Sequence, residues 1–204
     1  MQLRAFGDNI WIADGPAVTV LWPLQLPTRM VVVRLRDGTL WIDSPIEASR
    51  DEMDTVTQLG NVAHLVSPAR LHDWRLRSWS AHFPAARCWR RPEIFSDTSP
   101  SAWANDLDQV VFRGNAFARE VEFFHRPSRT LLFNDFLQNH WLTGNRVGVP
   151  FDIRISIINK ELARQSLHKL FSWEFDNLIV AHGDCVIGGA KALVSSAFRF
   201  LSPV

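Results

Sequence analysis

Short apolar runs and apolar stripes at helical spacing divide the chain into strands and helices. The predicted strands cover residues 10–13, 30–35, 39–43, 63–66, 109–113, 120–125, 130–133 and 177–181. The predicted helices cover residues 46–59, 71–83, 137–142, 161–173 and 190–201. Paired strands come first, and strands and helices alternate later. This order predicts an α/β fold of the α+β type, with mixed sheets and helices on their outer faces.

Turn residues mark where several of these elements end. Asp37-Gly38 supplies the positive φ that a tight hairpin needs, and Gly60 ends the first helix. The Pro-, Ser- and Asp-rich stretch 90–101 is too short to separate two cores, and the sequence contains no internal repeat. We therefore expect a single domain over residues 1–204.

Composition places the chain among globular proteins. Hydrophobic residues make up 47% and charged residues 21%, and the net charge is only +1. A charge so close to zero draws the chain neither to nucleic acid nor to an anionic membrane, so no such partner is expected. No apolar run resembles a membrane span or a secretory signal, and Cys88 and Cys185 form no CxxC pattern. These features predict a cytoplasmic protein.

Common catalytic motifs are missing from the sequence. It has no GxSxG nucleophile elbow, no GxxxxGK[ST] phosphate loop and no GxGxxG before a helix. The remaining candidates for chemistry are polar residues directly after predicted strands. They form the segments Ser67-Pro68-Ala69-Arg70-Leu71-His72-Asp73, Gly114-Asn115, Asn134-Asp135 and His182-Gly183.

The order and placement of these segments resemble the metallo-β-lactamase superfamily over nearly the whole chain. The resemblance implies a four-layer αββα sandwich with two mixed β-sheets, in a branch whose members form a domain of unknown function. In that superfamily, one loop reads HxHxDH and a later His follows Gly. An Asp ends a further strand, and a final His precedes Gly.

Matched in this frame, the first metal site of the superfamily is lost. Pro68 and Arg70 stand where the first two His would be, and Asn115 stands at the His after Gly. The HxHxDH motif is therefore degenerate in this chain. The resemblance makes Arg70 and Asn115 candidate substrate-binding residues for a small molecule, because Arg70 is a permanent cation that can hold an anionic group.

The second metal site of the superfamily matches His72, Asp73, Asp135 and His182. Two imidazoles and two carboxylates suit one Zn, Fe or Mn ion, so the resemblance implies at most one divalent metal. A chain with no metal is an equally open outcome. Asp73 and Asp135 are also the candidate catalytic residues.

Each of these residues has a structural interpretation as well. His72 and Asp73 suit the first turn of a helix, and Asp135 suits a strand-end turn or a helix N-cap. His182 suits a strand-to-loop corner whose next residue, Gly183, takes a positive φ. An ion pair between Arg70 and a nearby carboxylate would compete with a metal.

Two functions therefore follow from the sequence. The first is a binding or scaffold module that keeps the fold after its catalysis was lost or altered. The alternative is a single-metal-dependent hydrolase of an ester, amide, lactone or phosphoester. In the hydrolase, the ion lowers the pKa of a water molecule and a carboxylate accepts the proton.

Overall fold

The computed structural model describes residues 1–21, 24–90 and 92–201, without the side chains of residues 20, 21, 24, 70 and 71. The chain forms two compact units, unit 1 (Met1–Ile94) and unit 2 (Phe95–Val204). The division falls inside the predicted connection 90–101. Each unit is built on one mixed sheet with its own core, and a single domain over residues 1–204 stays a prediction.

Unit 1 contains a six-stranded sheet in the order β1-β2-β3-β4-β5-β6. The strands are β1 (Arg4–Gly7), β2 (Ile10–Leu21), β3 (Leu24–Arg34), β4 (Thr39–Asp43), β5 (Asn61–Val66) and β6 (Arg87–Trp89). The first four strands pair antiparallel, whereas β4, β5 and β6 pair parallel. The carboxyl ends of the three parallel strands therefore lie side by side at the same end of the sheet.

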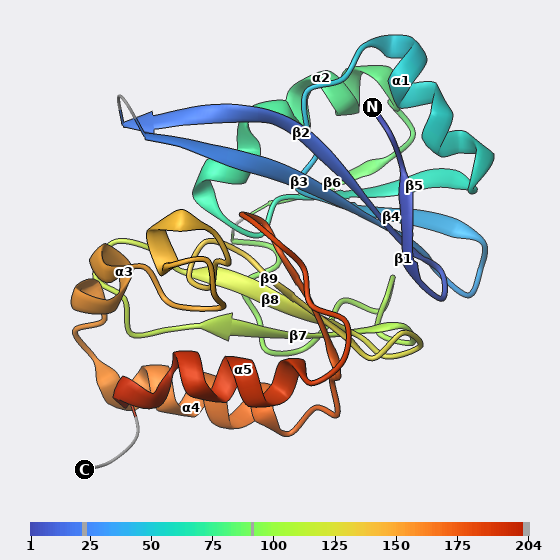
Figure 1. Ribbon diagram of the computed structural model, residues 1–204. Helices are drawn as coiled ribbons and strands as arrows, with labels where there is room; N and C mark the ends of the chain where they lie inside the picture. The colour runs from blue at the N-terminus through green and yellow to red at the C-terminus, as the bar shows by residue number, and fades with distance from the viewer. Residues whose placement is uncertain (22–23, 91, 202–204) are drawn as a thin grey trace. The chain divides into compact units, whose positions relative to one another are not determined.

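Helical segments of unit 1 cover one face of this sheet (Figure 1). They are α1 (Arg50–Asp54), η1 (Thr55–Gln58), η2 (Arg70–Arg75) and α2 (Leu76–His82). The predicted helix 46–59 was too long, because Ser49 is the N-cap of α1. Its hydroxyl accepts a hydrogen bond from the Glu52 backbone N–H, and the Glu52 carboxylate accepts one from the Ser49 N–H. Before this cap, the Ile46 carbonyl accepts a hydrogen bond from the indole of Trp79.

Unit 2 contains a four-stranded sheet in the order β10-β9-β8-β7. The strands are β7 (Leu107–Phe112), β8 (Glu120–His125), β9 (Thr130–Phe133) and β10 (Asn177–Val180). The pairs β7–β8 and β8–β9 are antiparallel, and β9–β10 is parallel. Because β9 and β10 are parallel and end in register at Phe133 and Val180, the residues that follow them begin at the same end of the sheet.

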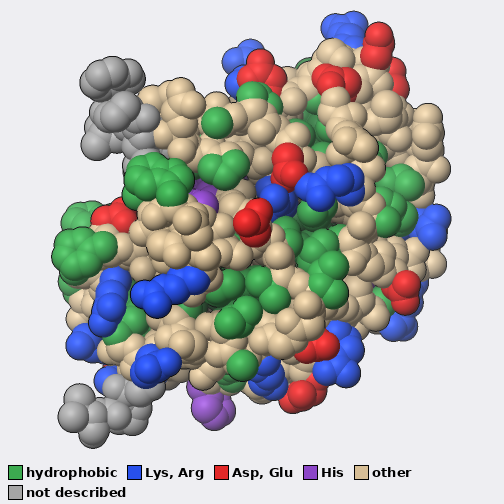
Figure 2. Space-filling model, viewed as in Figure 1, with side chains coloured by type: hydrophobic (Ala, Val, Ile, Leu, Met, Phe, Trp, Pro, Cys, Tyr) green, Lys and Arg blue, Asp and Glu red, His purple; other side chains and the backbone are tan. Residues whose placement is uncertain are grey.

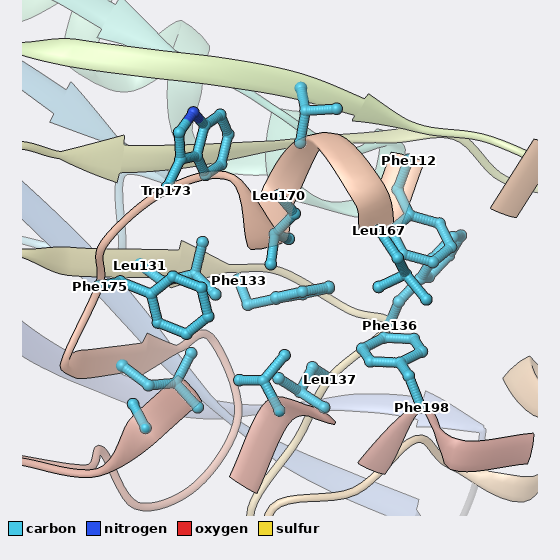
Figure 3. Packing of buried hydrophobic residues seen from close by; sticks show 14 of the residues in the cluster. Phe112, Leu131, Phe133, Phe136, Leu137, Leu167, Leu170, Trp173, Phe175 and Phe198 are labelled. Carbon is cyan, nitrogen blue, oxygen red and sulfur yellow. The ribbon is translucent and has the colours of Figure 1, made fainter. Parts of the chain in front are cut away.

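An aromatic core joins the sheet of unit 2 to its helices (Figure 3). The helical segments are η3 (Trp141–Thr143), α3 (Phe151–Ser156), α4 (Lys160–Phe171), α5 (Ala190–Ala197) and η4 (Arg199–Leu201). The ring of Phe112 lies 5.3 Å from that of Phe136 and 5.4 Å from that of Phe198. All three rings are almost fully buried, so this contact fixes α5 against the sheet.

The outer edge of β7 is occupied by side chains. The Val111 N–H donates to the Asp97 carboxylate at 2.9 Å, and the Val111 carbonyl accepts from the Ser166 hydroxyl at 3.1 Å. The same hydroxyl accepts from the Arg113 N–H at 3.1 Å. Backbone groups that would otherwise be exposed on an edge strand are therefore satisfied within the unit.

The two mixed sheets and the α/β class predicted from sequence are confirmed. Predicted strands 39–43, 120–125 and 130–133 coincide with β4, β8 and β9. The structure adds β1, β6 and α3, and it reduces the predicted helix 137–142 to the single turn η3. Among the described residues, no helix has the length and apolar character needed to cross a membrane.

Candidate metal centre

Asp135 and His182 form a close pair at the carboxyl ends of the two parallel strands of unit 2. Asp135 follows β9 and His182 follows β10, and Asp135 Oδ1 lies 3.1 Å from His182 Nε2. Their side chains are 19% and 9% exposed. The separation suits a hydrogen bond, and it also suits two ligands of one ion. Tetrahedral bonds of roughly 2 Å place neighbouring ligand atoms about 3 Å apart.

The corner after His182 depends on a close approach between two backbones. The Asn139 N–H donates to the His182 carbonyl at 3.1 Å, and the Asp184 N–H donates to the Asn139 carbonyl at 2.9 Å. Gly183, between them, has a φ of +103°, and a Cβ at this position would lie 2.0 Å from the Asn139 carbonyl oxygen. The positive φ predicted for Gly183 is confirmed. Only glycine fits here, because it lacks a Cβ.

Two buried glutamates hold the turn that contains Asp135. The Glu120 carboxylate accepts hydrogen bonds from the N–H groups of Asp135 at 3.0 Å and Phe136 at 2.9 Å. The Glu122 carboxylate accepts one from the Asn134 N–H at 3.0 Å. Sequence reasoning missed both residues. The available signal was a pair of acids two residues apart in the buried strand β8, where alternate side chains share a face.

The two glutamates cannot both be charged at low cost. Burial, followed by the charges of Glu122 and Asp135, raises the pKa of Glu120 well above its usual value. Burial also raises the pKa of Glu122 to about 8, even though hydrogen bonds from Glu120 and Asn134 oppose the rise. The pair therefore retains a proton at neutral pH instead of carrying two negative charges.

In unit 1, a chain of hydrogen bonds orients His72. The Ser44 hydroxyl donates to Asp43 Oδ1 at 2.9 Å and lies 2.5 Å from His72 Nδ1. Because a hydroxyl has one proton, His72 must donate from Nδ1, which leaves a lone pair on Nε2. Burial raises the pKa of Asp43 to about 6, opposed by the charge of His72 and the hydrogen bond from Ser44. Asp43 is therefore ionised at neutral pH.

Ser44 takes an unusual backbone conformation to reach this position. Its φ is +54°, in the left-handed region that residues other than glycine rarely adopt, and it is buried. Ser44 follows β4, and its N–H donates to the Val66 carbonyl of the parallel neighbour β5. Sequence reasoning missed the contact of Ser44 with His72.

The other residues predicted for the site have different surroundings. Asp73, next to His72 in η2, is half-buried, and its carboxylate has no hydrogen-bond partner among the described residues. Arg70 begins η2, but its side chain lies outside the described part of the chain. The carbonyl oxygen of the Asn115 side chain accepts from two backbone N–H groups of its own loop, and its amide donates to Ser156 Oγ at 2.7 Å. A substrate-binding role for Asn115 stays a prediction.

Solved structures with similar folds include metallo-β-lactamases. One from Pontibacter korlensis is 12% identical, with 98% of each chain covered and a TM-score of 0.68. Another, from Erythrobacter litoralis, is 10% identical, with 98% of this chain and 91% of that chain covered and a TM-score of 0.66. The metal-soaked Flv1 flavodiiron core from Synechocystis sp. PCC6803 is 10% identical at a TM-score of 0.69. The alignment covers 98% of this chain, which spans only 60% of that core.

The chain thus has a metallo-β-lactamase-like fold, as the sequence resemblance implied. Its residues 7–100, slightly under half of its length, match a family model described as a domain of unknown function, DUF4336. No curated protein matches the sequence.

The corner at Gly183 yields a first prediction. Gly183→Ala should lower the free energy of unfolding by at least about 2 kcal/mol, because it combines a strained φ with a clash against the Asn139 carbonyl. The control is Gly188→Ala, at a φ of +79° with no heavy atom within 4 Å of the added Cβ, which should cost only about 1 kcal/mol. Urea unfolding measures both values, and equal losses would contradict the close-approach argument.

The glutamate pair yields a second prediction, on pH. The raised pKa of Glu122 means that the folded state holds a proton that the unfolded state releases above about pH 4.5. Stability should therefore fall as the pH rises from about 5 to about 8. The expected slope is on the order of 1 kcal/mol per pH unit.

Urea unfolding in the presence of EDTA at several pH values tests this slope. Glu122→Gln removes the titrating group and keeps an acceptor for Asn134, so it should flatten the decline. The exposed Glu161→Gln should leave the decline unchanged. A Glu122→Gln profile parallel to that of the wild type would contradict the assignment of the decline to Glu122.

Proposed function

We propose that the chain binds a single divalent metal ion and hydrolyses an ester, amide, lactone or phosphoester. The observation that carries the proposal is the 3.1 Å approach of Asp135 Oδ1 to His182 Nε2, with the Asp135 backbone held by Glu120. By the family resemblance, His72 would be the third ligand and Asp73 a candidate fourth. The donors are imidazole nitrogens and carboxylate oxygens, which fit Zn, Fe or Mn.

Other residues of the chain keep these ligands ready to bind. The Asp43–Ser44 pair fixes the tautomer in which His72 Nε2 offers a lone pair, as second-layer carboxylates commonly do for metal-binding histidines. The backbone hydrogen bonds to Glu120 hold the turn at Asp135 before any ion arrives. This preorganisation favours binding, because little ordering remains to be done.

In the proposed reaction, Asp73 and Asp135 have different roles. A divalent ion held by these residues would lower the pKa of a water molecule and polarise the oxygen of the scissile bond. Asp73, whose carboxylate has no hydrogen-bond partner among the described residues, accepts the proton of the attacking water. Asp135 remains a ligand, since His182 and the Glu120 contacts fix its position. Arg70 binds an anionic group of the substrate.

A second candidate function is a binding or scaffold module without catalysis. It is favoured by Asn115, which stands where the resemblance expects a ligand but whose side chain is hydrogen-bonded to its own loop and to Ser156. Pro68 offers no ligand atom at all. Under this alternative, a metal or a small molecule binds, but no substrate is turned over.

The proposal includes a small-molecule substrate and a cytoplasmic location. The net charge of +1 argues against a polyanionic partner, and the two cysteines, which form no disulfide, fit a reducing compartment.

Metal content provides the test. Protein purified without chelator and loaded separately with Zn, Fe or Mn should retain close to one equivalent of its preferred ion by mass spectrometry. His182→Ala and Asp135→Asn should each abolish this retention. Ser44→Ala should weaken metal affinity by about 10- to 100-fold while leaving every ligand in place. The ion at about 100 times its Kd should stabilise the fold by roughly 2.7 kcal/mol.

His168→Ala is the matched control, because His168 is exposed on α4 and should not affect metal content. A wild-type protein that retains no metal and gains no stability from any of the three ions would refute the proposed site. Metal binding without turnover of ester, lactone and phosphoester probes would refute the hydrolase and support the binding module.

A further inference from the structure

Unit 2 contains a cavity of about 720 Å³ that has no part in the proposed function. Its walls come from the loop between η3 and α3, from α3 itself, and from the end of α5 with η4. Neither Asp135 nor His182 lines it. Its volume lies within the range of small-molecule sites, which is about 300 to 1,000 Å³.

Three arginines from three separate segments line this cavity. Arg146 belongs to the loop, Arg154 to α3 and Arg199 to η4. In the part of the chain that the structure describes, none of them forms an ion pair, and the cavity lining includes no carboxylate. On a chain with a net charge of only +1, this is a local concentration of positive charge.

Two of the guanidinium groups are held by neighbours that leave their charge uncompensated. The Arg154 guanidinium carbon lies 4.5 Å from the centre of the Phe200 ring, which orients it by a cation–π contact. Arg199 donates to Ser196 Oγ at 2.9 Å. Neither contact neutralises the arginine, so both retain donors for an anion.

The cavity also presents apolar surface beside this charge. Phe151, at the start of α3, is 75% exposed, and the Phe200 ring, Val147 and Val149 lie in the same lining. Figure 2 shows Lys and Arg side chains next to hydrophobic ones over the part of unit 2 where Figure 1 labels α3. An exposed aromatic ring beside a cavity offers apolar surface that a ligand can cover.

We propose that this cavity binds an organic phosphate, with the phosphate group on the three arginines and the apolar body against Phe151 and Phe200. A phosphate monoester offers three terminal oxygens, each able to accept from a guanidinium fork, whereas a carboxylate offers two. Three arginines around one cavity therefore match phosphate better than carboxylate. This site is independent of the proposed metal centre.

Isothermal titration with three probes tests the proposal: phenyl phosphate, inorganic phosphate and benzoate. Phenyl phosphate should bind at least about tenfold more tightly than the other two, because only it engages both the arginines and the aromatic surface. Arg154→Ala and Arg199→Ala should each weaken its binding by about tenfold, and Phe151→Ala should weaken phenyl phosphate but not inorganic phosphate. Arg119→Ala, an exposed arginine outside the cavity, is the matched control.

Vesicles distinguish the two sources of such a phosphate. Sedimentation with phosphatidylcholine vesicles that contain phosphatidic acid, lost in Arg154→Ala but not in Arg119→Ala, would identify a lipid headgroup. Binding of phenyl phosphate without sedimentation would identify a soluble phosphate. The proposal fails if phenyl phosphate binds no better than benzoate. It also fails if the Arg154→Ala/Arg199→Ala variant, shown to be folded by circular dichroism, binds as well as Arg119→Ala.

Discussion

The parallel register of β9 and β10 is the constraint on which the candidate metal centre of unit 2 depends. It brings together two side chains that are 47 positions apart in sequence, because the two strands end in register and the segments that follow them begin at the same end of the sheet. The backbone pairing continues past the strands, where Asn139 and Gly183 approach each other. Catalytic and binding groups commonly gather at the carboxyl ends of parallel strands, since the loops there converge without breaking the sheet.

Two buried acidic side chains position the backbone that follows β9. Glu120 and Glu122 lose the solvation of two carboxyls, and they are retained where three consecutive N–H groups of residues 134–136 need acceptors. The raised pKa values keep the pair from carrying two charges, which removes most of the repulsion between the carboxyls. In unit 1, the buried Asp43 also positions a polar group. It accepts a hydrogen bond from the Ser44 hydroxyl and so orients that hydroxyl toward His72. Both arrangements use an acid in the interior to orient a neighbouring polar group.

Sequence patterns predicted the parts that depend on burial and strand ends. The strand 130–133 and the positions of Asp135 and His182 directly after strands follow from apolar runs and from the family resemblance. The edge strands β1 and β6 were missed because a three- or four-residue segment with little burial carries almost no pattern. Individual side-chain hydrogen bonds could not be predicted either. Nothing in the spacing indicates that Ser44 contacts His72, 28 positions away, or that Asn115 bonds to Ser156. Such contacts are set by tertiary packing, about which the periodicity of a single sequence carries no information.

The occupied edge of β7 has a consequence for the behaviour of the protein in concentrated solution. An open edge strand offers a row of donors and acceptors on which a strand from another molecule can add, and growth of this kind leads to fibrils. Asp97 and Ser166 have already taken the outward-facing groups at Val111, one as acceptor and the other as donor. A strand arriving at this point would first have to displace an ionised carboxylate and a hydroxyl, both anchored from outside the sheet. Two small polar side chains thereby act as a barrier to templated aggregation.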